Sequence, residues 1–162
     1  MGMYEMNGVS KLTLSEDISL ITFNRLPADA AGAARILNQF SEAGINIDMI
    51  SQTAPNSGFI SFSFTVFAED LLNALALCNR LKDTMPDLRP MVSSGNCKIQ
   101  LYGDEMRTMH GVAARAIDAI AQSGSEIYLI TTSEVDISVL VPRDKFYEAV
   151  GALEKAFEVT CC

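Results

Sequence analysis

The sequence has few of the residues that build metal sites. It contains one histidine, His110, and four cysteines, with no Cys-x-x-Cys pair among them. The common zinc sites need closely spaced cysteine and histidine ligands, so we expect no metal and no other cofactor. No cysteine or aspartate is linked to His110 in the sequence as a nucleophilic set, so we expect no catalytic residues.

Long hydrophobic runs and an excess of positive charge are missing as well. No segment approaches the ~20 apolar residues of a membrane helix, and the N-terminus lacks the basic-then-apolar pattern of a secretory signal. The 12 basic residues are outnumbered by 20 acidic ones, which gives a net charge of -8 and a poor surface for phosphate. We therefore expect a cytoplasmic protein with reduced thiols that binds neither membranes nor nucleic acid.

The remaining composition is typical of a compact soluble protein. The chain has 162 residues, of which 49% are hydrophobic and 20% are charged. These values argue against disorder, and the length suits one domain or two small ones.

An internal repeat divides the chain. The tripeptide Ala-Ala-Arg at residues 33–35 recurs at residues 113–115, a spacing of 80. Further along, Phe62-Ser63 matches Ile137-Ser138 at a spacing of 75. The first copy thus holds about five extra residues, best placed in the turn-rich segment 54–58. A spacing that is held over several matches indicates a duplication.

Each copy predicts the same series of elements. Alternating apolar residues indicate strands, and apolar residues at helical spacing followed by glycine indicate helices. In the first copy the order is strand 18–23, helix 30–43, strand 45–52, strand 59–66, helix 69–83 and strand 86–92. In the second it is strand 97–103, helix 112–123, strand 126–133, strand 136–141 and helix 145–157, with 158–162 left for a short last strand. The order β-α-β-β-α-β is the ferredoxin-like motif, so the predicted fold class is α+β.

Residues 9–14 also alternate, and they precede the first copy. Because the second copy has little chain left for its last strand, we expect this N-terminal strand to complete the second sheet. The first domain, residues 15–94, would then be inserted into the second, formed by residues 1–14 plus 95–162. Coordinates in which residues 9–14 were unpaired, or paired only with the first sheet, would reject this hypothesis.

Two sets of motifs resemble a known family. Residues 26–27, 33–36 and 43–50 read LP, AARI and AGINIDMI, and they resemble the first ACT domain of aspartokinase. Residues 106–115, 130–134 and 137–139 read MRTMHGVAAR, ITTSE and ISV, and they resemble the second. The two sets occur in the family's order, and the resemblance covers about residues 7 to 160.

The resemblance implies two ferredoxin-like βαββαβ ACT domains, the first inserted into the second. In aspartokinases, tandem ACT domains form the feedback-control region that binds lysine or threonine as a small-molecule effector. The resemblance further implies a homodimer through ACT–ACT pairing and an aspartokinase catalytic chain as a partner. By itself the chain would be no enzyme, because it lacks the kinase catalytic domain.

A free amino acid carries a carboxylate close to an ammonium group. Backbone N–H groups at a helix N-terminus suit the carboxylate, and Asp or Asn side chains suit the ammonium. The strand-to-helix loops at residues 26–32 and 107–111 are therefore the expected binding places, and the resemblance adds positions on the neighbouring strands. The candidate ligand-binding residues are Ala28, Asp29, Ala31, Gly32, Ala33, Asn46, Ile47, Asp48, Gln52, Thr108, His110, Gly111, Val112, Glu126, Ile127, Ser133 and Glu134.

The chain departs from the family's motifs in both copies. Where the family's first loop has Asp, Pro and Gly, this chain has alanine at positions 28, 30 and 31. Asp29 and Gly32 take those roles if the loop is shifted by one residue. In the second copy the family's Pro is replaced by His110, and its strand Asn by Glu126. Glu126 either favours a cationic ligand such as lysine or is simply exposed.

Two further functions are compatible with these patterns. One is a stand-alone ACT amino-acid sensor, or an assembly module, with no kinase partner. The other is a purely structural dimerisation protein whose binding sites are inactive. Co-purification with a kinase chain would separate the regulatory function from the first, and failure to bind any free amino acid would favour the second.

Overall fold

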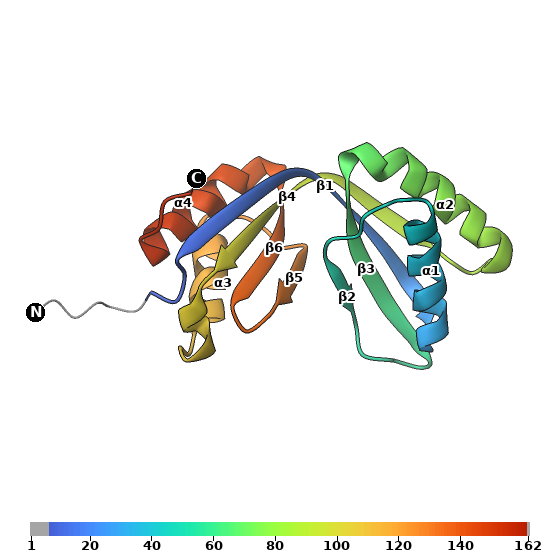
Figure 1. The fold of residues 1–162 in the computed structure, drawn as a ribbon, viewed down its shortest axis with the longest axis horizontal. Helices are drawn as coiled ribbons and strands as arrows, with labels where there is room; N and C mark the ends of the chain where they lie inside the picture. The colour runs from blue at the N-terminus through green and yellow to red at the C-terminus, as the bar shows by residue number, and fades with distance from the viewer. Residues whose placement is uncertain (1–6, 162) are drawn as a thin grey trace, which may run out of the picture. The chain divides into compact units, whose positions relative to one another are not determined.

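The computed structural model describes residues 7–161 (Figure 1). It divides into two compact units. A contiguous unit covers Asp17–Gly95, and a split unit combines the residues up to Glu16 with those from Asn96 onward. Strands follow the hydrogen-bonded order β2-β3-β1-β4-β6-β5. Strand β1 (Lys11–Pro27) and strand β4 (Pro90–Tyr102) each contribute residues to both units.

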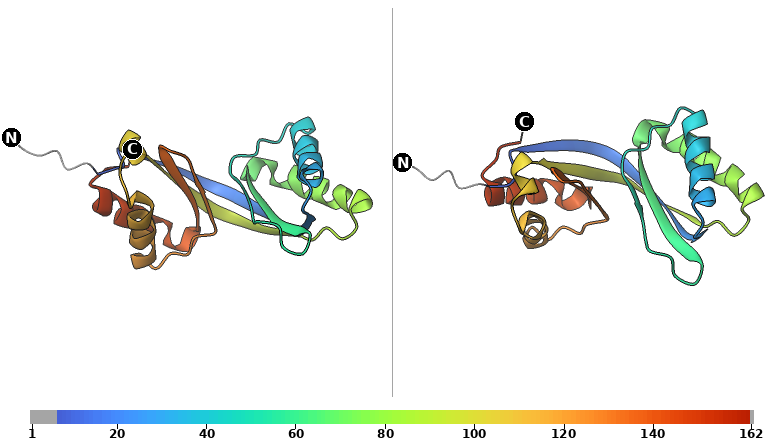
Figure 2. Two further views of the ribbon diagram at one scale, coloured as in Figure 1. Left: turned by 90° about the horizontal axis from the view of Figure 1, so that it is seen from below. Right: turned by 60° about the horizontal axis from the view of Figure 1, so that its bottom comes forward.

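In the contiguous unit, two helices cover one face of the strands (Figures 1 and 2). Its remaining elements are α1 (Ala30–Glu42), β2 (Ile50–Gln52), β3 (Phe59–Phe67), the short helix η1 (Ala68–Asp70) and α2 (Leu71–Thr84). β3 pairs antiparallel with β1 and β2. Its alternation turns Phe62 and Phe64 toward the helices, where Phe64 meets Phe40 edge to face at 5.0 Å.

The split unit has the same layered construction. Its further elements are η2 (Asp104–Arg107), α3 (Val112–Gln122), β5 (Leu129–Thr132), β6 (Asp136–Pro142), η3 (Arg143–Lys145) and α4 (Phe146–Phe157). β6 pairs antiparallel with β4 and β5. The core gathers Ile99, Val139, Phe146 and Phe157, all at most 1% exposed. Both units thus have the α+β, ferredoxin-like construction that the sequence predicts.

The N-terminal strand belongs to the core of the split unit. Leu12 is 1% exposed and packs in the same cluster as Ile99 and Val139. Just before β1 begins, the Ser10 N–H donates to the Tyr102 carbonyl over 2.8 Å. The division into an inserted and a surrounding ACT domain is taken up below as part of the proposed function.

The two predicted second strands are shorter than expected. Of residues 45–52 only Ile50–Gln52 is a regular strand, and of residues 126–133 only Leu129–Thr132. The Ile45 N–H donates back to the Phe40 carbonyl, and the preceding Gly44 has a φ of 74°. The chain therefore leaves α1 through a left-handed turn before it reaches β2, which delays regular pairing with β3.

The predicted last strand at 158–162 is wrong for the part that the structure describes, residues 158–161. Glu158 has a left-handed φ of 52° that ends α4. The Cys161 N–H then donates to the Glu154 carboxylate over 3.0 Å, which holds this segment against the helix. Cys162 lies outside the described residues. Over residues 7–161, no helix is long and apolar enough to cross a membrane.

Candidate functional site

A cavity of about 700 Å³ lies in the split unit where β4 leads into α3. One side is lined by the η2–α3 segment and the other by the β5–β6 turn. The lining residues are Met106, Arg107, Met109, His110, Gly111, Val112, Ala113, Thr132, Ser133, Glu134 and Ile137. Five of the predicted site residues are therefore brought together: His110, Gly111, Val112, Ser133 and Glu134.

The amino end of α3 opens onto this cavity. Its N-cap residue is Gly111, whose φ of 81° favours glycine and which has no side chain to bond the first turn. The first N–H groups of a helix have no partner within the helix, and they carry its positive end. The lining thus includes a backbone site of the kind that binds carboxylates and other anions.

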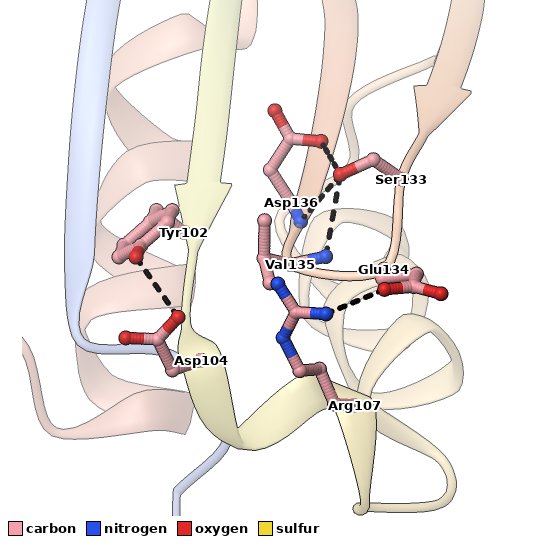
Figure 3. A network of polar contacts seen from close by, with 7 residues as sticks. All are labelled: Tyr102, Asp104, Arg107, Ser133, Glu134, Val135 and Asp136. Carbon is pink, nitrogen blue, oxygen red and sulfur yellow. Dashed lines mark hydrogen bonds and ion pairs between the residues drawn. The ribbon is translucent and has the colours of Figure 1, made fainter.

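The opposite wall is a turn held together by Ser133 (Figure 3). The Ser133 hydroxyl donates to the Asp136 carboxylate over 2.6 Å and accepts the N–H groups of Val135 and Asp136 at 3.2 Å. The side chain of Gln100 donates to the same carboxylate from β4 over 2.7 Å. The hydrogen bond from Ser133 is the main reason that the pKa of Asp136 is lowered, and the bond from Gln100 is the next. This turn is therefore a fixed wall.

Arg107 and Glu134 meet across the cavity. Arg107 ends η2 and Glu134 lies in the β5–β6 turn, and their side chains form an ion pair of 2.6 Å (Figure 3). The charged pair is well exposed, with 56% and 78% of the two side-chain surfaces accessible to solvent. Sequence reasoning placed Arg107 in the correct loop but did not name it as a contact.

A second cavity, of about 310 Å³, lies in the contiguous unit beside the first strand-to-helix loop. Three of the predicted ligand-binding residues line this cavity: Asp29, Ala31 and Gly32. The other lining residues are Arg25, Pro27, Arg35, Phe59, Thr84, Met85, Pro86, Asp87 and Leu88. Arg25 stacks over the Phe59 ring at 4.0 Å. The segment after α2 was missed, because no local pattern brings residues so distant in the chain to this loop.

Some polar groups of the first strand-to-helix loop already form hydrogen bonds within the contiguous unit. Asp29 is the N-cap of α1, and its carboxylate accepts the Gly32 N–H at 3.0 Å. The Ala28 N–H donates to the Gly58 carbonyl at 2.9 Å. Ala33 packs against the hydrophobic core. The loop therefore presents fewer open polar groups than the corresponding loop of the split unit.

The remaining first-copy candidates lie away from this loop. Asp48 bonds to Thr65 through its N–H, whereas Pro27 pairs with Phe59 at the other end of β3. Six residues of strand separate these two points, which is about 20 Å. Gln52 pairs with Phe62, which is closer to the loop, but Gln52 does not line the cavity. Asn46 is exposed and Ile47 is half-buried, and both lie just before Asp48.

The second-copy strand candidates are likewise apart from their cavity. Tyr128, which follows Glu126 and Ile127, donates its N–H to Leu140, while the cavity-lining Thr132 pairs with Ile137. Glu126 is exposed, and Ile127 packs against the core. The Thr108 hydroxyl donates to the Glu105 carbonyl within its own turn, at 3.4 Å. Among residues 7–161, no group of three or more His, Cys, Asp or Glu side chains is arranged to hold a metal ion.

Comparison with known proteins identifies the family. The ACT domain family profile matches residues 99–157. The aspartokinase of Pseudomonas aeruginosa is 32% identical over 154 residues, which is 93% of this chain and 37% of that protein. The chain thus spans little more than a third of the length of the curated relatives it matches.

Two solved structures match this chain over nearly their whole length. The regulatory subunit of aspartate kinase from Thermus flavus is 27% identical, with a TM-score of 0.83, and 92% of this chain covers 98% of it. A crystal structure of aspartokinase alpha and beta subunits contains a chain that is 30% identical, with a TM-score of 0.82. The match covers 93% of this chain and 99% of that one. The chain belongs to the aspartokinase family, and it corresponds to the ACT-type regulatory part rather than to the kinase domain.

Proposed function

We propose that the chain is an allosteric regulatory protein that binds lysine or threonine and passes this binding to an aspartokinase catalytic chain. The observation that carries the proposal is the cavity of the split unit, which joins the amino end of α3 to five of the predicted ligand residues. An α-amino acid offers a carboxylate for the α3 N–H groups and an ammonium for the acidic turn on the opposite wall. Kinship with regulatory subunits of aspartate kinase supports the regulatory role.

We further propose that the two units are two ACT domains, the first inserted into the second. Continuity of residues 17–95 and the N-terminal contribution of Leu12 to the split core support this division. The strands at the ends of the sheet order, β2 and β5, are edge strands, which favour pairing with another chain. Ile50 on β2 and Ile130 on β5 are 46% and 39% exposed. A homodimer through such edges would bring Gln52 of β2, and Asp48 just before this strand, to the loop of another chain.

A ligand shifts a regulatory equilibrium only as far as its affinity differs between the two states. The effector would therefore act by fixing the η2–α3 segment against the β5–β6 turn in one arrangement. In that arrangement the regulatory chain would pack on the catalytic chain differently from the way it packs without effector. The expected cellular setting remains the cytoplasm.

A stand-alone amino-acid sensor or assembly module is the second candidate. The first loop favours it, because Asp29 and the Ala28 N–H are already engaged within the contiguous unit. Co-expression with an aspartokinase catalytic chain from the same cell separates the two. Stable co-purification, with inhibition that depends on the amino acid, supports the regulatory function, whereas a protein that binds an amino acid and never a kinase is a sensor.

Thermal unfolding in the presence of each of the twenty amino acids tests the binding itself. A ligand at 100 times its Kd that binds only the folded state adds about 2.7 kcal/mol to the free energy of unfolding, so its unfolding midpoint should rise with dose. We expect this rise with lysine or threonine. Loss of the rise in His110→Ala would place the site in the split unit, and loss in Asp48→Ala would place it along β2. No rise with any amino acid would refute effector binding.

A further inference from the structure

The ion pair between Arg107 and Glu134 occupies the cavity that the proposed function assigns to the effector. Both side chains belong to the lining, and their charged atoms are 2.6 Å apart. Apart from His110, every other lining residue is uncharged. The side chains of Arg107 and Glu134 therefore neutralise each other within this lining.

Local hydrogen bonds close the two backbone turns that carry this pair. Glu134 lies in the turn held by Ser133, and the neighbouring Val135 carbonyl accepts the Gly103 N–H at 2.8 Å. The η2 turn that carries Arg107 is closed by the Met106 N–H, which donates to the Gly103 carbonyl at 3.1 Å. Figure 3 shows the two side chains reaching toward each other from these supports. The pair can therefore be opened by a movement of its two side chains alone.

Opening the pair requires little free energy. Ion pairs between exposed side chains contribute about 0–1 kcal/mol, because water solvates the separated charges. Both partners here are more than half exposed. A ligand that supplies its own charges to each partner can therefore replace the pair at small cost.

We propose that the effector binds by exchange with this ion pair: its α-carboxylate pairs with Arg107 in addition to the N–H groups of α3, and its α-ammonium pairs with Glu134. The proposal rests on the proposed function, since it needs an amino acid to enter this cavity. It makes Arg107 and Glu134 the residues that select a free amino acid. A compound with only a carboxylate or only an amine satisfies one partner and leaves the other without its ion pair.

Isothermal titration of the full chain with lysine, threonine and truncated analogues tests the exchange. 6-Aminohexanoate lacks the α-ammonium of lysine, cadaverine lacks its carboxylate, and 3-hydroxybutyrate lacks the ammonium of threonine. Because both side chains are exposed, loss of one of these ion pairs to the ligand weakens binding by up to about fivefold. We expect that loss in Arg107→Gln and in Glu134→Gln. We also expect Glu134→Gln to bind the amino acid and its analogue without α-ammonium equally well, and Arg107→Gln to lose the preference for the carboxylate.

The control is Arg143→Gln, which removes another exposed ion pair of the split unit, Arg143 to Glu16 at 3.8 Å, outside the cavity. It should bind like the wild-type protein. A pair that served structure alone would change the unfolding midpoint of the free variants and leave their affinities and analogue preferences unchanged, which overturns the exchange. If the wild-type chain binds no amino acid, both proposals fall. If it binds and both variants bind as tightly as the wild type, only the exchange falls.

Discussion

A methyl group placed on Gly103 would lie 1.8 Å from the carbonyl oxygen of Gly8. Gly103 has an extended φ of -170°, so the constraint is space and not backbone conformation. The segment before β1 passes directly over this residue. The Gly8 N–H also donates to the Glu105 carboxylate over 3.2 Å, which holds the segment in place.

We therefore expect Gly103→Ala to lower the free energy of unfolding by about 1–3 kcal/mol, the usual cost of forcing atoms into a filled space. Gly151→Ala is the matched control, because Gly151 lies within α4 and, apart from its chain neighbours and the backbone of its own helix, no atom of residues 7–161 comes within 4 Å of its added methyl. It should stabilise by about 0.5–1 kcal/mol through helix propensity. Urea unfolding of the two variants measures both effects, and a Gly103→Ala protein as stable as the wild type would contradict the close approach.

Asp29 gives a test that separates capping from binding. Removal of its N-cap bond to Gly32 in Asp29→Ala should cost about 1 kcal/mol of stability. Asp29→Asn keeps an accepting oxygen and should stay close to the wild type, since asparagine is an equally good N-cap. Urea unfolding gives the stabilities, and titration of the identified effector gives the affinities. Weakened binding in Asp29→Asn at unchanged stability would show instead that the carboxylate contacts the ligand.

The Asp136 carboxyl should make stability depend on pH in the acid range. Its pKa is lowered in the folded protein, first by the hydrogen bond from Ser133 and then by that from Gln100. A group whose folded pKa is depressed stabilises above its unfolded pKa, about 3.9 for aspartate, and that contribution is lost as the pH falls through the folded pKa. Because the group is well solvated, we expect less than about 1 kcal/mol.

The comparison that measures this contribution is wild type against Asp136→Asn, by urea unfolding between pH 7 and pH 3. The stability difference should be largest near neutrality and should shrink below about pH 4. Ser133→Ala should reduce the same acid dependence, because it removes the main hydrogen bond. A difference that stayed constant over this range would mean that Asp136 titrates alike in both states.

The Cys78 thiol should be inert in the folded protein. Burial in the core of the contiguous unit raises its pKa to about 11, and the thiolate is the reactive form. We expect iodoacetamide at pH 8 to modify the half-buried Cys161 much faster than Cys78. Mass spectrometry of digested samples, taken over time at increasing urea, assigns each rate. Equal rates for Cys78 and Cys161 without denaturant would contradict the packing around Cys78.

The sequence predicted most elements because its repeat doubled every local signal. Alternation along residues 59–66 and the glycines after α1 and α3 gave strands and helices close to their observed bounds. It overestimated the strands before Ile50 and Leu129, because β-rich composition does not reveal that the chain leaves each helix through a left-handed glycine. Nor does the sequence pattern indicate that Glu158 adopts a left-handed conformation that ends α4.

Local patterns could identify the loops of the candidate site but not their partners. His110 and Gly111 were placed by their motif, whereas the pairing of Arg107 with Glu134 depends on contacts between segments 27 residues apart. Equivalent positions of the repeat also differ in their contacts. Arg35 and Arg115 occupy equivalent positions, yet Arg115 donates to the Ala156 carbonyl at 2.6 Å and stacks on Phe157, while Arg35 lines the cavity of the contiguous unit.

The passage of β1 and β4 through both units has a consequence for the newly made chain. The ribosome delivers residues 17–95 as one uninterrupted stretch, so that unit can fold while α3 and α4 are still being synthesised. Leu12 must wait for Ile99 and Val139 before its core exists. By then the folded stretch has already shortened the loop that the split unit must close, which lowers the entropic cost of that late step. Biosynthesis thus favours one order of assembly, with the cavity of the split unit completed last.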